Sequence, residues 1–456
     1  MIYLCLFVGI TLSLFIYVSG SKNKMGFRNF TTYLSKNYVV SGSVKSDNQR
    51  NKDFLYWFTG FTDAEGNFLV TIDRKYIKLR FKISLHIDDI KVLYTIKSNL
   101  GFGRVVEESN RNSCSFIVED SLNINKLCDI FLHYPLHTSK KLDFISFYEV
   151  SLIRATNKVL SDVDMQKIVS IKNSMNSKRE IFTYSTSESQ IIINPNWFIG
   201  FIEGEGTFGI KTGSSLYFQV AQKNTSQECL NGITNFLLNL SSDASIHNDP
   251  DNKILPINIT NTINVRTNVV SLAIANVDAL YYYLLPYLDS YKFYSRKAID
   301  FKLWRIALLL KIYGYYYTTE GKNLFLDISA ILNKRYSTVS SVSNIDNVIN
   351  NITERFNDIM QKGSFAPPFD LKLNIPHTEN VRKYSITNRS ENPKIVYIYE
   401  DNKMVDGSPF ASFSSAHKAL GLKPSSNTCN RYIDTNRLYK NKYIFTSKPI
   451  DRASKD

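Results

Sequence analysis

The sequence has few of the residues that most often bind transition metals. Its 456 residues include only five cysteines and six histidines. The cysteines are scattered, and no two have the spacing of a zinc site or of a disulfide framework. The small number of histidines argues against a histidine-based nuclease or metalloprotease. We therefore expect a reduced, intracellular protein without a zinc site.

Acidic residues are also in deficit. Aspartate and glutamate total 41 against 55 lysines and arginines, which gives a formal net charge of +14. This excess favours a polyanionic partner, with nucleic acid ahead of an anionic membrane surface, and solubility alone is the remaining explanation. The length of the chain allows two or three domains, each with its own core.

Charge is absent from the start of the chain. Residues 2–19 form one apolar run that is just long enough for a membrane helix. No basic residue precedes the run, and no small-residue cleavage site follows it, so it fits a secretory signal poorly. We interpret residues 1–20 as a separate apolar segment, which would contact a membrane if it is retained, and the basic stretch 21–52 as a linker.

One ten-residue pattern occurs twice in the chain. Trp57–Gly66 reads WFTGFTDAEG, and Trp197–Gly206, which starts 140 residues later (197 − 57), reads WFIGFIEGEG. A second pair of similar segments, Ser139-Lys140-Lys141 and Ser295-Arg296-Lys297, leads in each case to Asp-Phe and a long helix. This repetition predicts two similar halves that each supply one copy of a shared site. We place the halves at 53–154 and 196–312, with a linker at 155–195 and a connecting region at 313–392.

Strands are expected after each copy of the pattern. Residues 68–73 and 79–86 alternate with period two, which predicts a hairpin with one buried face. Phe68, Val70, Ile72, Leu79, Phe81, Ile83 and Leu85 would face the core. An outer face that only contacts solvent is the commoner case. In a basic chain, however, the polar outer face favours a nucleic-acid surface. The candidate contacts are Asn67, Thr71, Asp73, Lys75, Arg80, Lys82, Ser84 and His86 in the first half, and Thr207, Lys211, Tyr217, Gln219 and Lys223 in the second.

The repeated pattern itself has the small-residue spacing of a close helix pair. Gly60 and Ala64 lie four residues apart on one helix face, and so do Gly200 and Gly204. We therefore expect the two pattern helices to pack together across a pseudo-twofold axis. Gly66 and Gly206 would then form left-handed caps at the helix ends. The neighbouring aromatic residues should point into the core of their own half: Trp57, Phe58 and Phe61 in the first, and Trp197, Phe198 and Phe201 in the second.

Two carboxylates would meet at the ends of these helices. Glu65 and Glu205 each oppose a helix dipole, at a cost of roughly 0.3–1 kcal/mol, and they also repel each other. A divalent cation would offset both effects, and oxygen ligands suit Mg²⁺. A metal beside a basic surface indicates phosphodiester hydrolysis. Asp63 and Glu203 could be structural, so we leave them out of the predicted catalytic set.

At these residues the chain resembles the LAGLIDADG homing endonucleases that carry two motifs on one polypeptide. The resemblance covers about residues 53–312 and implies an α+β fold of two pseudo-symmetric αββαββα halves that form a saddle over double-stranded DNA. It implies a monomer that cleaves specific DNA sites with Mg²⁺, for which Mn²⁺ can substitute. The eighth motif position, Glu65 and Glu205, would bind metal through its acid, and the seventh, Ala64 and Gly204, through a backbone carbonyl. Lys140 and Arg296, or else Lys141 and Lys297, would assist catalysis.

The tail at 393–456 contains a strand pattern and two short helices, at 412–420 and 427–433. Its residues Ser408-Pro-Phe, Ser414–Gly421, Arg431-Tyr-Ile and Leu438–Tyr443 resemble a nuclease-associated modular DNA-binding domain. The helix pair is typical of a helix-turn-helix unit, although such pairs are also common packing units. Arg431 and Lys440 are the DNA contacts that this resemblance implies.

The family is often encoded in organellar introns, in frame with an upstream exon. That context explains residues 1–20 as the remnant of a membrane-protein exon, with a true membrane anchor as the alternative, and implies a mitochondrial location after processing. Some members help to splice their own intron, so an RNA maturase that binds host intron RNA is the alternative function to a homing endonuclease. Retention of an acid in both motif copies favours the endonuclease.

Overall fold

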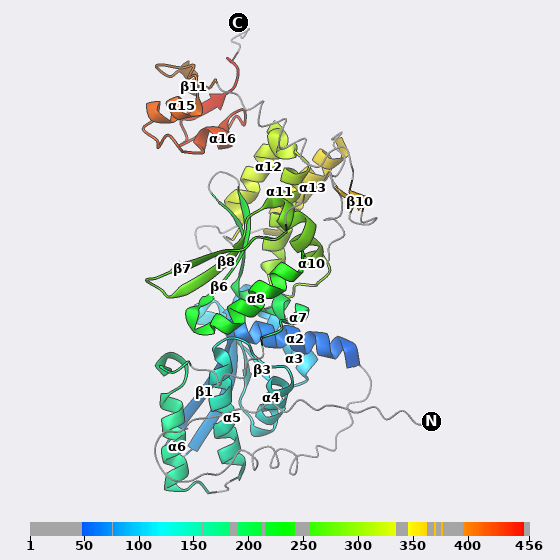
Figure 1. Ribbon diagram of the computed structural model, residues 1–456, viewed down its shortest axis with the longest axis vertical. Helices are drawn as coiled ribbons and strands as arrows, with labels where there is room; N and C mark the ends of the chain where they lie inside the picture. Colours follow the sequence, from blue (N-terminus) through cyan, green and yellow to red (C-terminus); the bar gives the residue numbers. More distant parts are fainter. Residues whose placement is uncertain are drawn as a thin grey trace, which may run out of the picture.

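A computed structural model describes residues 48–74, 76–156, 159–182, 190–211, 215–241, 256–333, 345–362, 369–370, 375–376 and 395–450. Two helices cross at the centre of the elongated molecule, α2 (Asn48–Glu65) and α7 (Pro195–Glu205), and each begins one half of the protein (Figure 1). The apolar segment at 1–20 and Lys75 lie outside the described residues. In the part that the structure describes, no helix combines the length and apolarity needed to cross a bilayer.

The first half has the predicted order of elements. After α2 come one hairpin, a helix, a second hairpin and a further helix, and the four antiparallel strands form one sheet in the order β1-β2-β4-β3. The bounds are β1 (Gly66–Asp73), β2 (Tyr76–His86), α3 (Ile90–Leu100), β3 (Arg104–Glu108), β4 (Ser113–Val118) and α4 (Ser121–His133).

The second half repeats this order after α7, and its sheet has the equivalent order β5-β6-β8-β7. The predicted α+β fold of two αββαββα halves is therefore confirmed. Its last helix is broken into α9, a π-helical turn and α10. The bounds are β5 (Gly206–Ile210), β6 (Leu216–Lys223), α8 (Gln227–Asn239), β7 (Thr260–Asn264), β8 (Val269–Ile274), α9 (Val277–Ala279), the π turn (Leu280–Leu284) and α10 (Leu285–Asp289).

Each half continues beyond the border expected from the sequence. A long helix is followed by one more helix in both halves: α5 (Lys140–Thr156) and α6 (Asp162–Asn173), then α11 (Lys297–Ile312) and α12 (Thr319–Ile331). These pairs are 157 residues apart (297 − 140 and 319 − 162). The Nδ2 of Asn176 donates to Phe68 O at 3.0 Å, and that of Asn333 donates to Phe208 O at 2.7 Å. The duplication thus extends past 154 and 312, into the segments expected to connect the halves.

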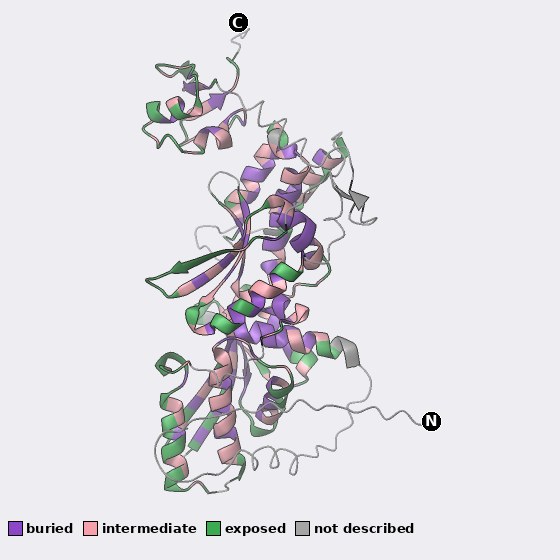
Figure 2. Cartoon of the chain, viewed as in Figure 1, coloured by how far each residue is buried: buried purple, intermediate pink, exposed green. Residues whose placement is uncertain are grey.

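The alternation of the strands separates a core face from an exposed face. Phe68, Phe81 and Ile83 have no exposed surface, whereas Asn67, Arg80 and Ser84 are exposed, as the sequence predicts. Ile72 and Leu85 are partly buried against the same core. Buried residues follow α2, α7 and the inner face of each sheet, while β7 is exposed along its length (Figure 2).

The tail is a separately packed module. Its core of Val396, Ile398, Phe410, Ala416, Cys429, Ile433 and Phe445 is distinct from that of the two halves. The sheet order is β12-β11-β13, and both expected helices are present. The helix-turn-helix interpretation is not confirmed, because the two helices pack on a sheet. The bounds are β11 (Tyr397–Glu400), β12 (Lys403–Met404), α15 (Phe413–Ala419), α16 (Thr428–Tyr432) and β13 (Tyr443–Thr446), preceded by α13 (Ile345–Lys362) and the strand pair β9 (Phe369–Asp370) and β10 (Ile375–Pro376).

Candidate active site between the two motif helices

The site lies where α2 and α7 touch. A Cβ added at Gly60 would overlap the carbonyl oxygen of Trp197, and one added at Gly200 would overlap that of Trp57. The backbones of the two helices are therefore in direct contact at equivalent positions. This contact confirms the expected close helix pair and brings the ends of both helices together.

The expected left-handed caps are wrong. Gly206 has φ −75° and ψ 145°, which is extended, and Gly66 begins β1 directly. The chain needs glycine here for space, because a Cβ would lie 2.5 Å from Thr62 Cγ2 in one copy and 2.6 Å from Ile202 O in the other. Each helix consequently passes straight into a strand, which keeps the preceding acid at the junction.

Glu65 and Glu205 are neighbours across this junction. A Cβ added at Gly204 would lie 2.8 Å from Glu65 Oε1, so the carboxylate of one helix rests on the glycine of the other. Burial and the negative charge of Glu65 raise the pKa of Glu205 to about 7, against the influence of Lys140, Lys297 and a hydrogen bond from Gln222. The Gln222 Nε2 donates to Glu205 Oε1 at 2.9 Å. The electrostatic conflict expected between the two acids is therefore present.

Asp63 and Glu203 have a different role. Asp63 is 1% exposed and accepts hydrogen bonds from His137 N at 2.7 Å, Thr138 N at 3.0 Å and Thr138 Oγ1 at 2.6 Å. Glu203 is 4% exposed and accepts from Tyr294 N at 2.9 Å and Ser295 N at 2.5 Å. Each acid thus fastens the loop that precedes the long helix of its own half, as a structural group would.

The aromatic residues of the motifs divide into two groups. Phe58 packs on Phe131 in its own half, with ring centroids 5.7 Å apart, as expected. Trp57 and Trp197 instead cross the interface, so their expected placement in their own halves is wrong. Trp57 Nε1 donates to Glu203 Oε1 at 2.8 Å, and Trp197 Nε1 donates to Asp63 Oδ2 at 3.0 Å. Each indole N–H thus donates to a buried acid of the opposite half.

Two lysines, Lys140 and Lys297, lie beside the acids. Lys140 Nζ donates to Thr62 O and Ala64 O, both at 3.1 Å, and Lys297 Nζ donates to Gly206 O at 2.6 Å. Burial lowers the pKa of Lys140. The two lysines start equivalent helices, whereas the Arg296 guanidinium pairs with Asp88. Lys140 is therefore the structural equivalent of Lys297 and not of Arg296. The two segments align one residue away from the register that the sequence suggested.

An open cavity of about 380 Å³ extends from this junction. Its lining includes Ala64, Lys140, Glu205, Gln222 and Lys223. Among the residues that the structure describes, no group of three or more His, Cys, Asp or Glu side chains could hold a metal ion. Two adjacent carboxylates, with cavity space for water and phosphate oxygens, fit Mg²⁺, which proteins usually bind through one or two carboxylates. The Ala64 carbonyl already accepts from Lys140, and a carbonyl oxygen has a second lone pair.

The outer face of the first sheet carries paired charges. Arg80 and Arg104 share Glu119, at 2.9 and 2.6 Å, and Lys82 contacts Glu108 at 3.2 Å. Strand register sets Asn67 opposite Lys82 on this face. Three further candidates have partners here: Asp73 pairs with Lys78, Ser84 Oγ lies 3.1 Å from Ser115 Oγ, and His86 contacts Asp88; Thr71 is exposed.

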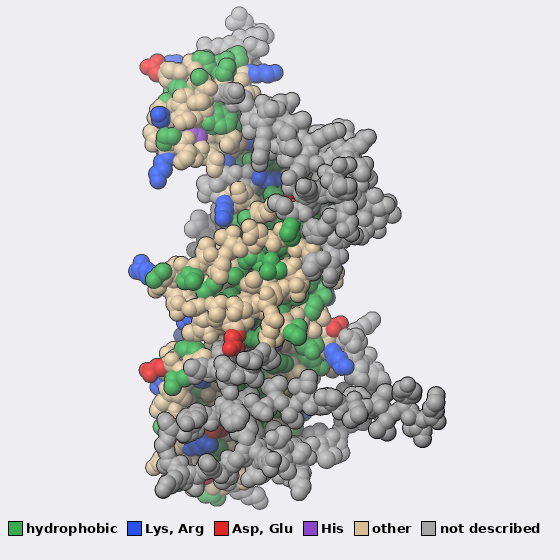
Figure 3. Space-filling view, viewed as in Figure 1, with side chains coloured by type: hydrophobic (Ala, Val, Ile, Leu, Met, Phe, Trp, Pro, Cys, Tyr) green, Lys and Arg blue, Asp and Glu red, His purple; other side chains and the backbone are tan. Residues whose placement is uncertain are grey.

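The outer face of the second sheet carries the Tyr217 ring with a lysine beside it. The Tyr217 ring lies over Gly209, and Lys211 Nζ is 5.5 Å from its centroid. Thr207 is opposite Gln219, and Lys223 is exposed at the end of β6. Lys and Arg side chains project from the β7–β8 hairpin and from the module in Figure 3. Arg431 and Lys440 belong to the module, where each cation lies within 6 Å of a tyrosine ring centre, at 5.9 and 5.6 Å.

Gln222 is the site residue that sequence reasoning missed. It lies on the helix-facing side of β6, in phase with the buried Phe218 and Val220. The pairing Gly66↔Ile83 in one sheet and Gly206↔Val220 in the other makes Leu85 its counterpart. A glutamine in one half at the position where the other half has leucine indicates a functional residue. This difference can be recognised only when the strand register of both sheets is known.

Comparisons with known proteins match both halves of the chain. The sequence model of the LAGLIDADG endonuclease family matches residues 58–151 and 198–308, one region in each half. The uncharacterized mitochondrial protein RF1 of Saccharomyces cerevisiae is 27% identical over 439 residues, which cover 93% of this chain and 89% of that protein. The probable intron-encoded endonuclease Cox1-I1b of Schizosaccharomyces pombe is 27% identical over 280 residues, which cover 59% of this chain and 67% of that protein.

Solved structures match both halves at once. The LAGLIDADG homing endonuclease I-GzeII, in complex with its DNA target, has a TM-score of 0.52 at 25% identity and covers 62% of this chain and 99% of its own. The LAGLIDADG meganuclease I-CpaMI, bound to uncleaved DNA, has a TM-score of 0.52 at 23% identity and covers 61% of this chain and 99% of its own. With both motif helices, both sheets and both matched regions on one polypeptide, this chain belongs to the LAGLIDADG endonuclease family.

Proposed function

We propose that this protein is a site-specific endonuclease that hydrolyses phosphodiester bonds in double-stranded DNA, with divalent metal held by Glu65 and Glu205. The observation that carries the proposal is the meeting of these two acids, one from each half, at the ends of packed helices. Metal would supply polarisation of the scissile phosphate and an acidified water. Mg²⁺ suits the oxygen donors, Mn²⁺ can substitute, and the Ala64 and Gly204 carbonyls are further candidate ligands.

Two lysines support the same chemistry. Lys140 and Lys297 place ammonium groups on main-chain carbonyls beside the acids. Held there, they would stabilise the negative charge that accumulates on the phosphate during hydrolysis. Both also lower the pKa of Glu205, which favours the ionised form that binds metal.

The outer faces of the sheets would bind the DNA. Arg80 and Arg104 share the single carboxylate of Glu119, so this group keeps a net positive charge. Phosphate oxygens would compete with Glu119 for the two guanidinium groups, which gives binding that weakens with salt. In the second half, the Tyr217 ring and the Gln219 amide would contact base edges of the DNA.

The relatives suggest the biological setting. RF1 is described as mitochondrial and Cox1-I1b as intron-encoded. We extend both descriptions to this chain and propose that it acts in the mitochondrion, where cleavage of intron-less DNA would promote intron mobility. A splicing role with the host intron RNA is the alternative, and it needs the basic surface without needing both acids.

The test is cleavage of the intron-less exon junction. Purified full-length protein should cut a duplex that carries this junction in Mg²⁺ or Mn²⁺, and should leave it intact in EDTA. A duplex interrupted by the intron serves as the matched control. Equal cutting of both duplexes would contradict site specificity, and cutting in EDTA would contradict the role of metal. If neither duplex is cut while the protein accelerates splicing of the host intron, the maturase alternative replaces the proposal.

A further inference from the structure

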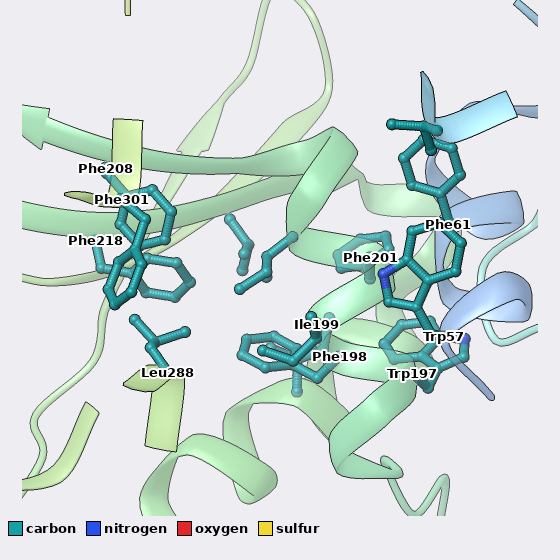
Figure 4. Close-up of a cluster of buried hydrophobic side chains, with 14 of the residues drawn as sticks. Trp57, Phe61, Trp197, Phe198, Ile199, Phe201, Phe208, Phe218, Leu288 and Phe301 are labelled. Atoms are coloured by element: carbon teal, nitrogen blue, oxygen red, sulfur yellow. The ribbon is translucent and has the colours of Figure 1, made fainter. Parts of the chain in front are cut away.

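The two motif tryptophans form a reciprocal pair across the interface. Trp197 belongs to the second half and donates to Asp63 of the first at 3.0 Å, while Trp57 belongs to the first half and donates to Glu203 of the second at 2.8 Å. Both indoles are at most 2% exposed, and Figure 4 shows them where α2 and α7 meet. Each half thus supplies a buried donor to a buried acid of the other.

Each tryptophan also packs on the loop that its acid fastens. The His137 ring lies against Trp197 with centroids 4.9 Å apart, and the Tyr294 ring lies against Trp57 at 4.8 Å. The backbone N–H of His137 donates to Asp63, and that of Tyr294 donates to Glu203. The loop is therefore held on one side by its own acid and on the other by the tryptophan of the opposite half.

These loops set the start of the lysine helices. Thr138 Oγ1 donates to Asp63 at 2.6 Å and accepts from Lys140 N at 3.3 Å. In the second half, Ser295 N donates to Glu203 at 2.5 Å, and Ser295 Oγ accepts from Lys297 N at 3.2 Å. A continuous chain of hydrogen bonds thus runs from each tryptophan, through an acid and a hydroxyl-bearing residue, to the lysine of the opposite half.

We propose that Trp57 and Trp197 are positioning residues, each of which sets the catalytic lysine of the opposite half. Trp197 positions Lys140 through Asp63 and Thr138, and Trp57 positions Lys297 through Glu203 and Ser295. This inference rests on the proposed endonuclease function. It explains why a tryptophan precedes each motif, since a phenylalanine would supply a buried aromatic ring but no N–H donor.

The pseudo-twofold arrangement gives the proposal a distinctive consequence. A DNA duplex has its own twofold symmetry, so a protein with two related halves presents one half to the scissile phosphate of each strand. Displacing a single lysine would therefore slow the cutting of one strand more than the other. The two tryptophan variants should slow opposite strands.

The experiment uses full-length Trp197→Phe and Trp57→Phe with a junction duplex labelled differently on its two strands, under single-turnover conditions in Mg²⁺. Because misplacement of a catalytic group costs one or more orders of magnitude, we expect each variant to slow one strand by about tenfold relative to the other. The favoured strand should be reversed between the two variants. Thr138→Val, which removes the hydroxyl between Asp63 and Lys140, should slow the same strand as Trp197→Phe and provides a second route if that variant does not fold.

Trp304 provides a matched control. It has no exposed surface, and within the described part of the chain its Nε1 has no hydrogen-bond partner. Trp304→Phe therefore makes the same change without breaking a hydrogen bond, and the ratio of the two strand rates should stay that of the wild type. Equal slowing of both strands by the motif variants, or slowing of the same strand by both, would overturn the inference. A wild-type protein that cuts neither strand would instead overturn the proposed function on which the inference rests.

Discussion

Each motif has two acids that lie two residues apart, and the first and second acids have opposite environments. Asp63 is surrounded by donors that satisfy its carboxylate, whereas Glu205 is half-buried beside a second carboxylate, which with burial raises its pKa to about 7. Sequence spacing identified Glu65 and Glu205 as the unfavourably placed pair. It could not show which donors surround Asp63 and Glu203, because those donors come from loops about 75 and 91 residues further along the chain.

Loss of charge at Asp63 should destabilise the protein. In Asp63→Asn, an amide NH₂ would replace an oxygen that accepts from backbone and side-chain donors. Leaving such buried donors without an acceptor costs about 2–4 kcal/mol of unfolding free energy. Urea unfolding followed by circular dichroism measures the loss, and Glu203→Gln provides the equivalent change in the second half. Wild-type stability in both variants would contradict the structural role.

Loss of charge at Glu205 should instead stabilise the protein. Its pKa is higher in the folded protein than the ordinary value, so ionisation is penalised on folding, and this penalty is complete above about pH 7. In EDTA at pH 8, Glu205→Gln should therefore have a Tm equal to or above that of the wild type. At pH 5 most of the advantage should disappear, because Glu205 is then protonated in the folded state. A lower Tm than wild type at pH 8 would show that the carboxylate is satisfied without metal.

At the scale of elements, local patterns predicted most of the structure. The strands at 68–73 and 79–86 and the tail helices at 412–420 and 427–433 lie close to where the sequence indicated. The left-handed caps at Gly66 and Gly206 were wrong because a strand follows each helix without a turn. The sequence also did not separate α6 and α12 from the segments that connect the halves, because their equivalence shows only in shared contacts such as those of Asn176 and Asn333.

The helix contact itself can be tested with two glycines. In Gly60→Ala the new methyl group meets rigid backbone of α7, so we expect a loss of about 3 kcal/mol or more together with loss of cleavage. Gly101→Ala is the matched control, since its Cβ has open space and only the positive φ of 74° is strained, at a cost of about 1 kcal/mol. Chemical unfolding of both variants measures the difference. Equal losses would contradict direct backbone contact between α2 and α7.

At the scale of the whole molecule, the tail module is held to the second half by polar contacts. Arg437 donates to Asn323 Oδ1 at 3.0 Å and to Asp327 Oδ1 at 2.5 Å, and Lys322 Nζ donates to Ile433 O at 3.0 Å. Burial lowers the pKa of Lys322 to about 8. The equivalent positions of α6, 157 residues earlier, are Met165, Gln166 and Ser170. The symmetry of the halves is thus broken where the module docks, which no local pattern in the tail reveals.

Arg437→Ala should release the module without unfolding either part. The module has its own hydrophobic core, so the loss of the three hydrogen bonds of Arg437 removes most of the polar contacts that hold it, with that of Lys322 left, and leaves both folds intact. Hydrogen exchange should become faster at 433–437 and along α12, with little change in α2 and α7. Lys440→Ala, which removes an exposed module cation that lies over the Tyr439 ring, is the control. Unchanged exchange in Arg437→Ala would show that other contacts fix the module.

The central claim is that Glu65 and Glu205 together form one metal-dependent cleavage site. It is tested most directly by measuring binding and cutting of the same junction duplex by the wild type and by Glu65→Gln combined with Glu205→Gln. Since metal catalysis contributes several kcal/mol, we predict a cleavage rate at least about a thousandfold lower in Mg²⁺, with the affinity for DNA retained. Cutting by the double variant at the wild-type rate would contradict the account.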